Sequence, residues 1–528
     1  MQPSLPSVQA SPQVPDAAVL PTPPALPWRE ALALALWLVL TIAWRPLLLP
    51  DEGRYASVAY DMLRGDGVVP TLNGLPFFHK PPLLYWLDGG ALRLFGINEF
   101  AVRCGPALLA WVLGMALFLH ARRWHGAAVA RSALAVLATS PFFFVGGQYV
   151  NHDIGVAACI TAACFSIVRA VENPNRTARR WLLVGWAFCA LGVLAKGLIG
   201  VVLPALIIGP WLLAQGRWRQ MLALLHPLGL LVFAAVVLPW MLAMQQRFTG
   251  FFDYFIVEQH FRRFTGTTFN NRMPVWFYFA VLPLLMLPWS LWLAGLRPAA
   301  LRAAVPQATA ARLGLYAWWT LAIVGFFSLP SSKLVGYGLP ALAPVAVLLA
   351  LVLNARRTPW PRVAAGAAVA CVAVVAVLAW KAPGSHRELG RTLGAQVQPG
   401  DRVAFIDEVF YDLPFYARLT TSAIVVAAWD APDVTAQDNW RKELFDATRF
   451  SPDRGASVLW NWQRLAELPC FSGRLWIVTA GVHRARVAAA IEGLTLVQAV
   501  RGVELLTVPG RTCAGGAARP AASPARAP

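Results

Sequence analysis

Long apolar segments separated by short charged stretches constrain this chain more than any other feature of its sequence. A helix needs about 20 apolar residues to cross a bilayer, and segments of this kind recur along most of the chain. Hydrophobic residues make up 58% of the sequence, above the roughly 45–50% that is usual in soluble domains. The segments predict a polytopic α-helical membrane protein with about 11 to 13 transmembrane helices. They lie near residues 29–49, 99–120, 126–147, 149–171, 180–197, 198–215, 224–246, 274–296, 313–330, 335–354 and 361–381.

The formal net charge of +19 is carried mainly by dispersed arginines. Arginines scattered in short clusters between apolar segments are typical of cytoplasmic loops, so the charge indicates membrane orientation rather than nucleic-acid binding. If the N-terminus is cytoplasmic and the spans alternate, each cytoplasmic loop contains arginines. These are Arg122 and Arg123; Arg176, Arg179 and Arg180; Arg217 and Arg219; Arg297, Arg302 and Arg312; Arg356, Arg357 and Arg362.

With this orientation, nearly all residues of chemical interest fall on the outer, periplasmic side. The expected domains are a disordered cytoplasmic tail, a transmembrane domain whose outer loop contains an amphipathic helix, a periplasmic α/β domain and a second disordered tail. Their boundaries are 1–28, 29–381 (with the outer loop at 51–98), 385–508 and 509–528. The α/β domain is predicted because strand-like runs such as RLWIVTA alternate with helical stretches such as HRARVAAAIEGL.

Two of the seven cysteines lie in the polar C-terminal part of the chain. Cys470 and Cys513 would form a disulfide if this part lies in an oxidising compartment. The other cysteines lie in or beside apolar segments, where cysteine is an ordinary packing residue.

The first outer loop opens with two carboxylates, Asp51 and Glu52, directly after an apolar segment. Ionisable groups at membrane depth indicate a functional site, although a solvated helix end is the plain alternative. The stretch RYASVAYDMLR then places Tyr55, Val58 and Met62 on one helical face, as in a helix that lies in the membrane interface.

The same loop continues with the stretch FFHKPPLLYW. Pro81 and Pro82 fix the backbone direction and keep Lys80 out of a helix. A rigidly aimed ammonium group suits a phosphate partner, whereas a lysine that reaches toward the membrane surface is the alternative. His79 has the chemistry to donate to a phosphate, shuttle a proton or bind a metal ion.

Further polar residues recur at the predicted outer ends of the apolar segments. Asp153 begins one segment, where it also suits a helix N-cap, and Lys196 is wedged between two apolar runs. The remaining candidates are His260 and Arg262 in EQHFRRF, and Lys333 and Tyr337 in SSKLVGYG. Together these residues predict a membrane-level cavity with at least two carboxylates and several cations, suited to a phosphorylated lipid donor.

The ordered motifs resemble those of a known family. DEGRYASVAYDMLRGDG, VPTLNGLPFFHKPPLLYW, FGINEFAVR, YVNHDIG, LAKGLIGVVLP and SSKLVGYGLPALAP, in this order, resemble the ArnT-like aminoarabinose transferases. These are grouped with protein O-mannosyltransferases among the GT-C-fold membrane glycosyltransferases. The resemblance covers roughly residues 29–355 and implies a GT-C fold. It also implies transfer of a sugar from a polyprenyl phosphate at the outer face of the bacterial inner membrane.

By motif position, the resemblance implies that Asp51 is the catalytic acidic residue and Asp153 a second active-site carboxylate. Lys80, with Arg54, would contact the donor phosphate, and Tyr337 would lie nearby. Lys333 joins these phosphate candidates. Glu52, His79, Lys196, His260 and Arg262 are the candidate substrate-binding residues. The chain departs from the family at His79, where ArnT-type enzymes often carry glutamate, so a role for a divalent metal ion stays open.

Three functions remain open from the sequence. The first is transfer of an aminosugar, such as 4-amino-4-deoxy-L-arabinose, from undecaprenyl phosphate to lipid A or a related envelope glycan. The second is mannosyl transfer to a protein serine or threonine, which would require a base to activate the hydroxyl. The third is transport of the lipid-linked sugar, which is disfavoured because no internal repeat is evident and the charges gather on one side.

Overall fold

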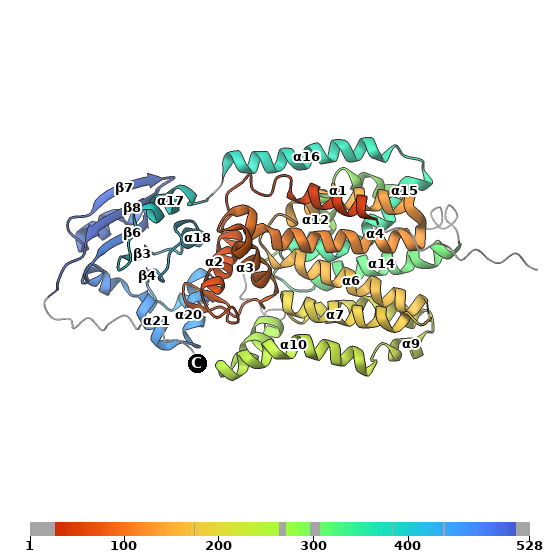
Figure 1. Cartoon of the computed structure of the whole chain (residues 1–528), viewed down its shortest axis with the longest axis horizontal. Coiled ribbons are helices and arrows are strands. Elements are labelled where there is room, and N and C mark those ends of the chain that lie inside the picture. Colours follow the sequence, from red (N-terminus) through yellow and green to blue (C-terminus); the bar gives the residue numbers. More distant parts are fainter. Residues whose placement is uncertain are drawn as a thin grey trace, which may run out of the picture.

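The structure is a computed structural model of the chain and describes residues 27–173, 175–262, 271–295, 307–382, 384–436 and 439–513. A long bundle of helices lies beside a smaller region built around a β-sheet (Figure 1). The helices α2 (Asp51–Arg64) and α3 (Leu83–Phe95) lie where the two regions meet. This junction contains most of the candidate site.

The bundle is centred on α6, which is buried along almost its whole length and packs against α4, α7, α8 and η3. α16 runs along one side of the bundle toward the sheet (Figure 1). The helices of the bundle are α1 (Trp28–Val39), α4 (Glu99–Ala138), α5 (Pro141–Gly146), α6 (His152–Glu172), α7 (Ala178–Lys196), α8 (Ile199–Ala214), α9 (Trp218–Ala223), α10 (Pro227–Arg247), η1 (Asp253–Arg262), α12 (Phe277–Leu285), η2 (Trp289–Gly295), α14 (Gln307–Ser328), η3 (Val335–Ala341), α15 (Leu342–Ala355) and α16 (Trp360–Lys381).

Six helices in the described part of the chain are long and apolar enough to cross a membrane, or seven if α12 and η2 form one bent span. They make the chain a multi-pass membrane protein. The sequence divides residues 99–147 into two spans, and the structure agrees on the division: Gly126, with φ 86° and ψ 170°, breaks α4 into two helical parts. The second of these spans contains a further break that was not predicted, because α4 stops at Ala138 and Pro141 begins α5, which ends at Gly146.

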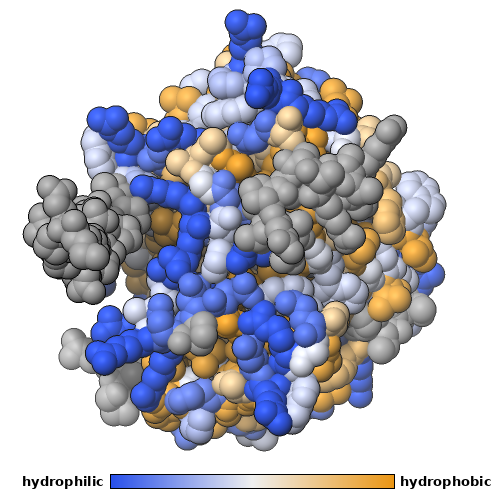
Figure 2. Space-filling view, turned by 90° about the vertical axis from the view of Figure 1, so that its right-hand side faces the viewer, coloured by the Kyte–Doolittle hydropathy of each residue, from blue (hydrophilic) through white to orange (hydrophobic). Residues whose placement is uncertain are grey.

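The end of the bundle away from the sheet carries many hydrophilic side chains (Figure 2). Most of the predicted loop arginines in the described residues are exposed, for example Arg123, Arg180 and Arg356. Arg312 is an exception: it lies within α14, is buried, and pairs with Glu172 at 3.2 Å. Arg297 and Arg302 lie outside the described residues.

The outer loop folds against the sheet region. Nine of the fourteen residues of α2 are buried, on more than one face, so other parts of the protein cover much of this helix. A short hairpin follows, formed by β1 (Thr71–Leu72) and β2 (Leu75–Pro76). Asn73 and Gly74 turn it with positive φ angles, as in a two-residue hairpin loop.

The C-terminal region contains a six-stranded mixed sheet in the order β5-β4-β3-β6-β8-β7. The four strands β3 to β6 are mutually parallel where they pair, and β8 runs antiparallel to both β6 and β7. The strands are β3 (Arg402–Ile406), β4 (Ile424–Val426), β5 (Leu459–Trp460), β6 (Arg474–Ala480), β7 (Thr495–Val500) and β8 (Val503–Pro509). The helices are α17 (Arg387–Gln396), α18 (Leu413–Ala417), α19 (Asp433–Ala436), α20 (Trp440–Thr448), α21 (Pro452–Val458), η4 (Trp462–Glu467), η5 (Gly481–His483) and α22 (Arg484–Ala490).

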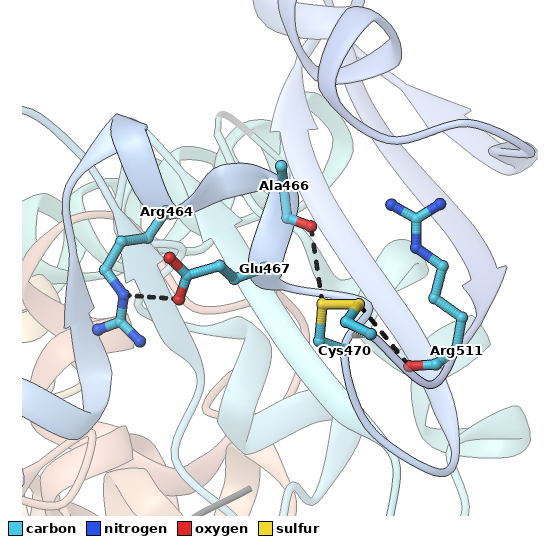
Figure 3. Close-up of a disulfide and its surroundings, with 6 residues drawn as sticks. Arg464, Ala466, Glu467, Cys470 and Arg511 are labelled. Atoms are coloured by element: carbon cyan, nitrogen blue, oxygen red, sulfur yellow. Dashed lines mark hydrogen bonds and ion pairs between the residues drawn. A yellow bond between two sulfur atoms is a disulfide. The ribbon is translucent and has the colours of Figure 1, made fainter. Parts of the chain in front are cut away.

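A disulfide joins Cys470 to Cys513 at the edge of this region (Figure 3). The predicted pairing is therefore confirmed. It ties the segment after β8 to the loop before β6, where a backbone bridge between Cys470 and Arg511 reinforces it. The remaining five cysteines are free thiols.

Candidate active site

Asp51 is the first residue of α2 and lies beside the start of α6. The Asn151 amide donates to Asp51 Oδ2 at 3.0 Å, and its carbonyl oxygen accepts from the Asp153 backbone N–H at 3.0 Å. Asn151 thereby caps α6 and links the Asp51 side chain to the backbone of Asp153. Two candidate residues from distant motifs are thus bonded to one side chain, Asp51 through its carboxylate and Asp153 through its backbone.

Asp153 forms an ion pair with Lys196, the last residue of α7. The Lys196 ammonium lies 4.5 Å from the centre of the Tyr337 ring, within the range of a cation–π contact. Gly336 approaches Asp153 so closely that a Cβ atom there would collide with the carboxylate. Three candidate residues, Asp153, Lys196 and Tyr337, therefore meet although they come from separate helices.

Arg54 lies one helical turn after Asp51 and pairs with it. Its Nη1 donates to both carboxylate oxygens of Glu443, at 2.9 and 3.0 Å. Burial is the largest single influence and disfavours the charged guanidinium, but Glu443, Tyr55, Tyr411 and Asp51 together outweigh it, so the pKa of Arg54 lies well above its ordinary value. Arg54 is therefore a permanently charged group beside Asp51.

Lys80 and His79 follow the hairpin in a non-helical turn before α3. His79 stacks on Phe77, and its Nδ1 lies 3.7 Å from the Glu443 carboxylate. Lys80 donates to the His79 carbonyl at 3.2 Å and lies near enough to His152 for an electrostatic interaction. The turn thus reaches the same cluster as Asp51 and Asp153.

The His152 imidazole forms a buried wall of this cluster. Its ring meets the rings of Tyr55 and Tyr85 edge to face, each with centroids 4.9 Å apart. The ring nitrogen Nδ1 lies 2.8 Å from the Ala195 carbonyl oxygen, one residue before Lys196. His152 therefore packs α2, α3 and α7 together behind the carboxylates.

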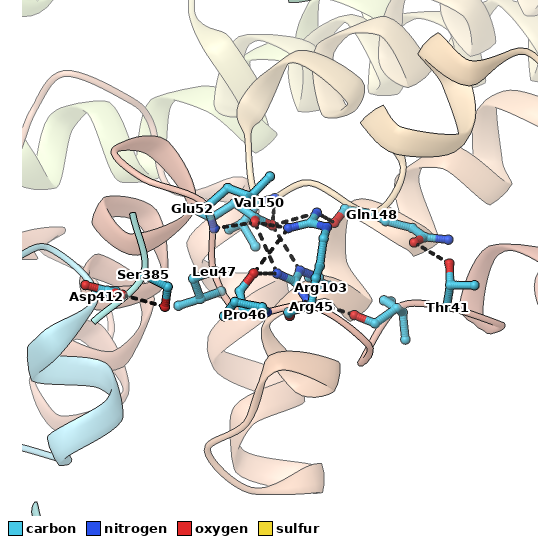
Figure 4. A network of polar contacts seen from close by, with 12 residues as sticks. Thr41, Arg45, Pro46, Leu47, Glu52, Arg103, Gln148, Val150, Ser385 and Asp412 are labelled. Carbon is cyan, nitrogen blue, oxygen red and sulfur yellow. Dashed lines mark hydrogen bonds and ion pairs between the residues drawn. The ribbon is translucent and has the colours of Figure 1, made fainter. Parts of the chain in front are cut away.

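Glu52 does not join the site, contrary to the prediction that it contacts substrate. Its side chain is fully buried, and Arg45 and Arg103 pair with it (Figure 4). The backbone N–H groups of Leu48 and Val150 also donate to it, at 2.8 and 3.1 Å. Burial alone would raise its pKa, but the two arginines outweigh burial and hold it at about 2. Glu52 is a structural anion that fixes the start of α2.

Two further candidates, Lys333 and His260, have structural partners away from the carboxylates, and a third, Arg262, is exposed. Lys333 is buried and donates to the carbonyls of Met273 and Pro330, at 2.9 and 2.5 Å. His260 Nε2 accepts from the Leu198 backbone N–H at 3.1 Å, which satisfies a donor at the start of α8. Arg262 is exposed at the end of η1. The structure therefore does not bring Lys333, His260 or Arg262 against Asp51 or Asp153 by any of these contacts.

Sequence reasoning missed Glu443 and Tyr411, which come from the C-terminal region. Glu443 lies in the first turn of α20 and accepts from the Tyr411 hydroxyl at 2.7 Å. No local motif identifies either residue, because their neighbours lie more than 350 positions away in α2. The sequence suggested Asp153 as a helix N-cap, whereas the structure shows that Asn151 caps α6 and also bonds to Asp51.

No group of three or more His, Cys, Asp or Glu side chains that could hold a metal ion occurs among the described residues. The cluster described above places two carboxylates beside several cations. Asp51 and Asp153 are suited to stabilising a developing oxocarbenium ion or accepting a proton. Arg54, Lys196 and Lys80 are suited to compensating the charge of a phosphate.

Comparisons with known proteins identify a family model and several named relatives. Residues 79–242 match the family model described as dolichyl-phosphate-mannose-protein mannosyltransferase. Over 325 residues the chain is 35% identical to an undecaprenyl phosphate-alpha-4-amino-4-deoxy-L-arabinose arabinosyl transferase of Pseudomonas aeruginosa, covering 60% of this chain and 58% of that protein. It is 33% identical to the protein of the same name from Erwinia tasmaniensis, over 61% and 58%. The chain thus matches a little under three fifths of these relatives' length.

The solved structures extend the likeness to nearly the whole chain. The crystal structure of ArnT from Cupriavidus metallidurans bound to undecaprenyl phosphate has a TM-score of 0.77 and 23% identity, covering 92% of this chain and 98% of that one. Mycobacterial arabinofuranosyltransferase AftD has a TM-score of 0.53 and 16% identity, over 92% and 40%. The predicted resemblance to ArnT-like proteins and the GT-C fold with a C-terminal α/β region are confirmed.

Proposed function

We propose that this protein is a membrane glycosyltransferase that moves 4-amino-4-deoxy-L-arabinose from undecaprenyl phosphate to lipid A or a related envelope glycan. The observation that carries the proposal is the linkage of Asp51 to Asp153 through Asn151, with Arg54 and Lys196 paired to the two carboxylates. The names of the relatives support the choice of sugar and lipid carrier.

The reaction we propose is a displacement at the anomeric carbon of the sugar. The bond between that carbon and the undecaprenyl phosphate oxygen breaks, and a bond to an acceptor oxygen forms on the opposite face. The leaving lipid phosphate gains a negative charge as the sugar departs. Cations placed before the reaction starts stabilise such charge most effectively, because they need no reorganisation during it.

Residue roles follow from the charges that this step creates. Lys80 and Arg54 would bind the donor phosphate, and Lys196 with Tyr337 would complete its surroundings. Asp51 would stabilise positive charge on the sugar ring and Asp153 would hold Lys196 in place. A lipid A phosphate acts as nucleophile without a base, whereas an acceptor hydroxyl would transfer its proton to Asp51.

We further propose that the protein lies in the bacterial inner membrane with the site facing the periplasm. The arginines of the loops between apolar segments support this orientation. The Cys470–Cys513 disulfide supports placing the C-terminal region in an oxidising compartment. Residues 29–381 would then form the catalytic membrane domain and residues 385–508 a periplasmic domain.

Mass spectrometry of lipid A from bacteria with and without this gene tests the proposal. We expect lipid A species carrying added 4-amino-4-deoxy-L-arabinose only in cells with the gene. The family match to protein mannosyltransferases favours a second candidate, for which lipid A would be unchanged while glycosylated proteins disappear on deletion. Unchanged lipid A and unchanged glycoproteins would contradict both.

A further inference from the structure

Glu443 reaches the candidate site from the C-terminal region. Its side chain is 6% exposed and both carboxylate oxygens contact Arg54 Nη1, at 2.9 and 3.0 Å. Its Oε2 also accepts from the Tyr411 hydroxyl at 2.7 Å, and its Oε1 lies 3.7 Å from His79. The Glu443 carboxylate therefore contacts two candidate residues of the first outer loop, Arg54 and His79, which are 25 positions apart in the sequence. Glu443 itself lies 389 positions after Arg54.

The helix that carries Glu443 is firmly placed. Asn439 caps α20 by accepting from the backbone N–H groups of Arg441 and Lys442. The ring of Trp440 packs edge to face on Trp429 at 5.7 Å. A charged residue in the first turn of a capped helix has little freedom to leave its partner, so the direction of Glu443 is built into the fold.

The C-terminal region is also bonded to α2 and the hairpin at other points. The Ser57 hydroxyl donates to the Tyr411 carbonyl at 2.6 Å. Asn73 exchanges two hydrogen bonds of 2.8 Å with the backbone of Ala423. These bonds hold the C-terminal region against α2 and the hairpin. The positions of Arg54 and Glu443 relative to each other therefore do not depend on their ion pair alone.

The contacts of Arg54 divide its guanidinium between two carboxylates. Nη1 is bonded to Glu443, and Nη2 is bonded to one oxygen of Asp51. The other oxygen of Asp51 is bonded to Asn151. Without the charge of Glu443, Arg54 would be free to turn both nitrogens toward Asp51, as planar guanidinium and carboxylate groups prefer.

We infer that Glu443 is a positioning residue of the transfer site: it holds Arg54 in the orientation that leaves Asp51 and the donor phosphate correctly aligned. The inference rests on the proposed function and deepens it, because it makes the C-terminal region part of the catalytic unit. Glu443 acts through Arg54 and is not assigned a contact with the sugar.

The test uses the full-length protein in lipid nanodiscs and the variant Glu443→Gln, which keeps the side-chain size but removes its charge. We expect kcat/KM for the lipid-linked donor to fall about ten- to hundredfold, the range for losing a charge-assisted contact. The KM for lipid A should stay within about twofold. Glu443 acts through Arg54, so its replacement should have little further effect once Arg54 is removed. In an Arg54→Ala background, Glu443→Gln should lower kcat/KM for the donor by less than about twofold.

The matched control is Asp433→Asn, which removes an arginine-paired carboxylate from the same region. Asp433 pairs with Arg441 and is 58% exposed. We expect wild-type kinetics from it. Tyr411→Phe removes only the hydroxyl that fixes Glu443 and gives a milder second variant if Glu443→Gln does not fold.

Two results would overturn the inference: wild-type kinetics in Glu443→Gln, or an equal loss in the presence and absence of the Arg54 side chain. A substrate-free measurement separates this from the proposed function. Phenylglyoxal modifies accessible arginines, and mass spectrometry should show faster modification of Arg54 in Glu443→Gln than in wild type. If the wild type transfers no sugar, the proposed function fails, and equal Arg54 modification rates would also end the inference.

Discussion

The neighbouring carboxylates Asp51 and Glu52 should give opposite phenotypes when each is replaced by its amide. Glu52→Gln leaves two buried arginines, Arg45 and Arg103, without a compensating charge. Removing one partner of a buried ion pair costs about 3–5 kcal/mol of folding free energy. Asp51→Asn alters a partly exposed group at the start of α2 and should change stability by under about 1 kcal/mol.

The pKa of Glu52 gives a second value for its contribution to the free energy of unfolding. Lowering the pKa from 4.5 to about 2 corresponds to about 3 kcal/mol of stability. Because the folded-state pKa is the lower one, this contribution is present above pH 4.5 and is lost as the pH falls toward 2. Both routes therefore give a loss of about 3 kcal/mol or more at neutral pH for Glu52→Gln.

The assay pairs thermal unfolding in detergent with turnover in nanodiscs. Glu52→Gln should lower Tm by on the order of 5 °C while the folded fraction keeps its turnover. Asp51→Asn should keep its Tm and lose turnover. An unchanged Tm together with lost turnover in Glu52→Gln would refute the structural role of Glu52 and return it to the site.

Three further predictions concern the donor, pH and topology. Lys80→Ala should raise the KM for the donor about ten- to hundredfold and leave that for lipid A unchanged; unchanged donor kinetics would instead support a lysine that only reaches the membrane surface. Burial raises the pKa of the Asp61 carboxyl from 3.8 to about 6. The protonated carboxyl therefore contributes to folding stability fully below about pH 4, and this contribution is lost as the pH rises through about 6. The free energy of unfolding of Asp61→Asn should lack this pH dependence. A membrane-impermeant maleimide should label Ser457→Cys but not Thr177→Cys in spheroplasts, with Cys104→Ser as background, and equal labelling would contradict the orientation.

Much of the bundle was predictable from sequence, because a membrane span depends on local apolar length. The break at Gly126 within α4 lies at the boundary between two predicted spans. The break between Ala138 and Pro141 was not predicted, because the apolar pattern continues across it. Strand β6 coincides with the predicted strand-like run RLWIVTA, whereas the two-residue β5 carries too little pattern to detect.

Some residues of the candidate site could be predicted from the sequence, and others could not. Asp51, Asp153 and Lys196 carry a signal because charges at the ends of apolar segments are costly unless they are used. The same signal also selected Glu52, whose buried partners Arg45 and Arg103 are visible only in three dimensions. Glu443 had no such signal, since its role depends on how the C-terminal region packs on α2.

Sugar transfer by purified protein tests the central claim most directly. Wild-type protein in liposomes would receive undecaprenyl-phosphate-linked 4-amino-4-deoxy-L-arabinose and lipid A, with Asp51→Asn and Asp153→Asn as parallel variants. We expect mass spectrometry to show lipid A heavier by one aminoarabinosyl group with the wild type and with neither variant. Unmodified lipid A with folded, donor-binding wild-type protein, or full activity in both variants, would contradict the account.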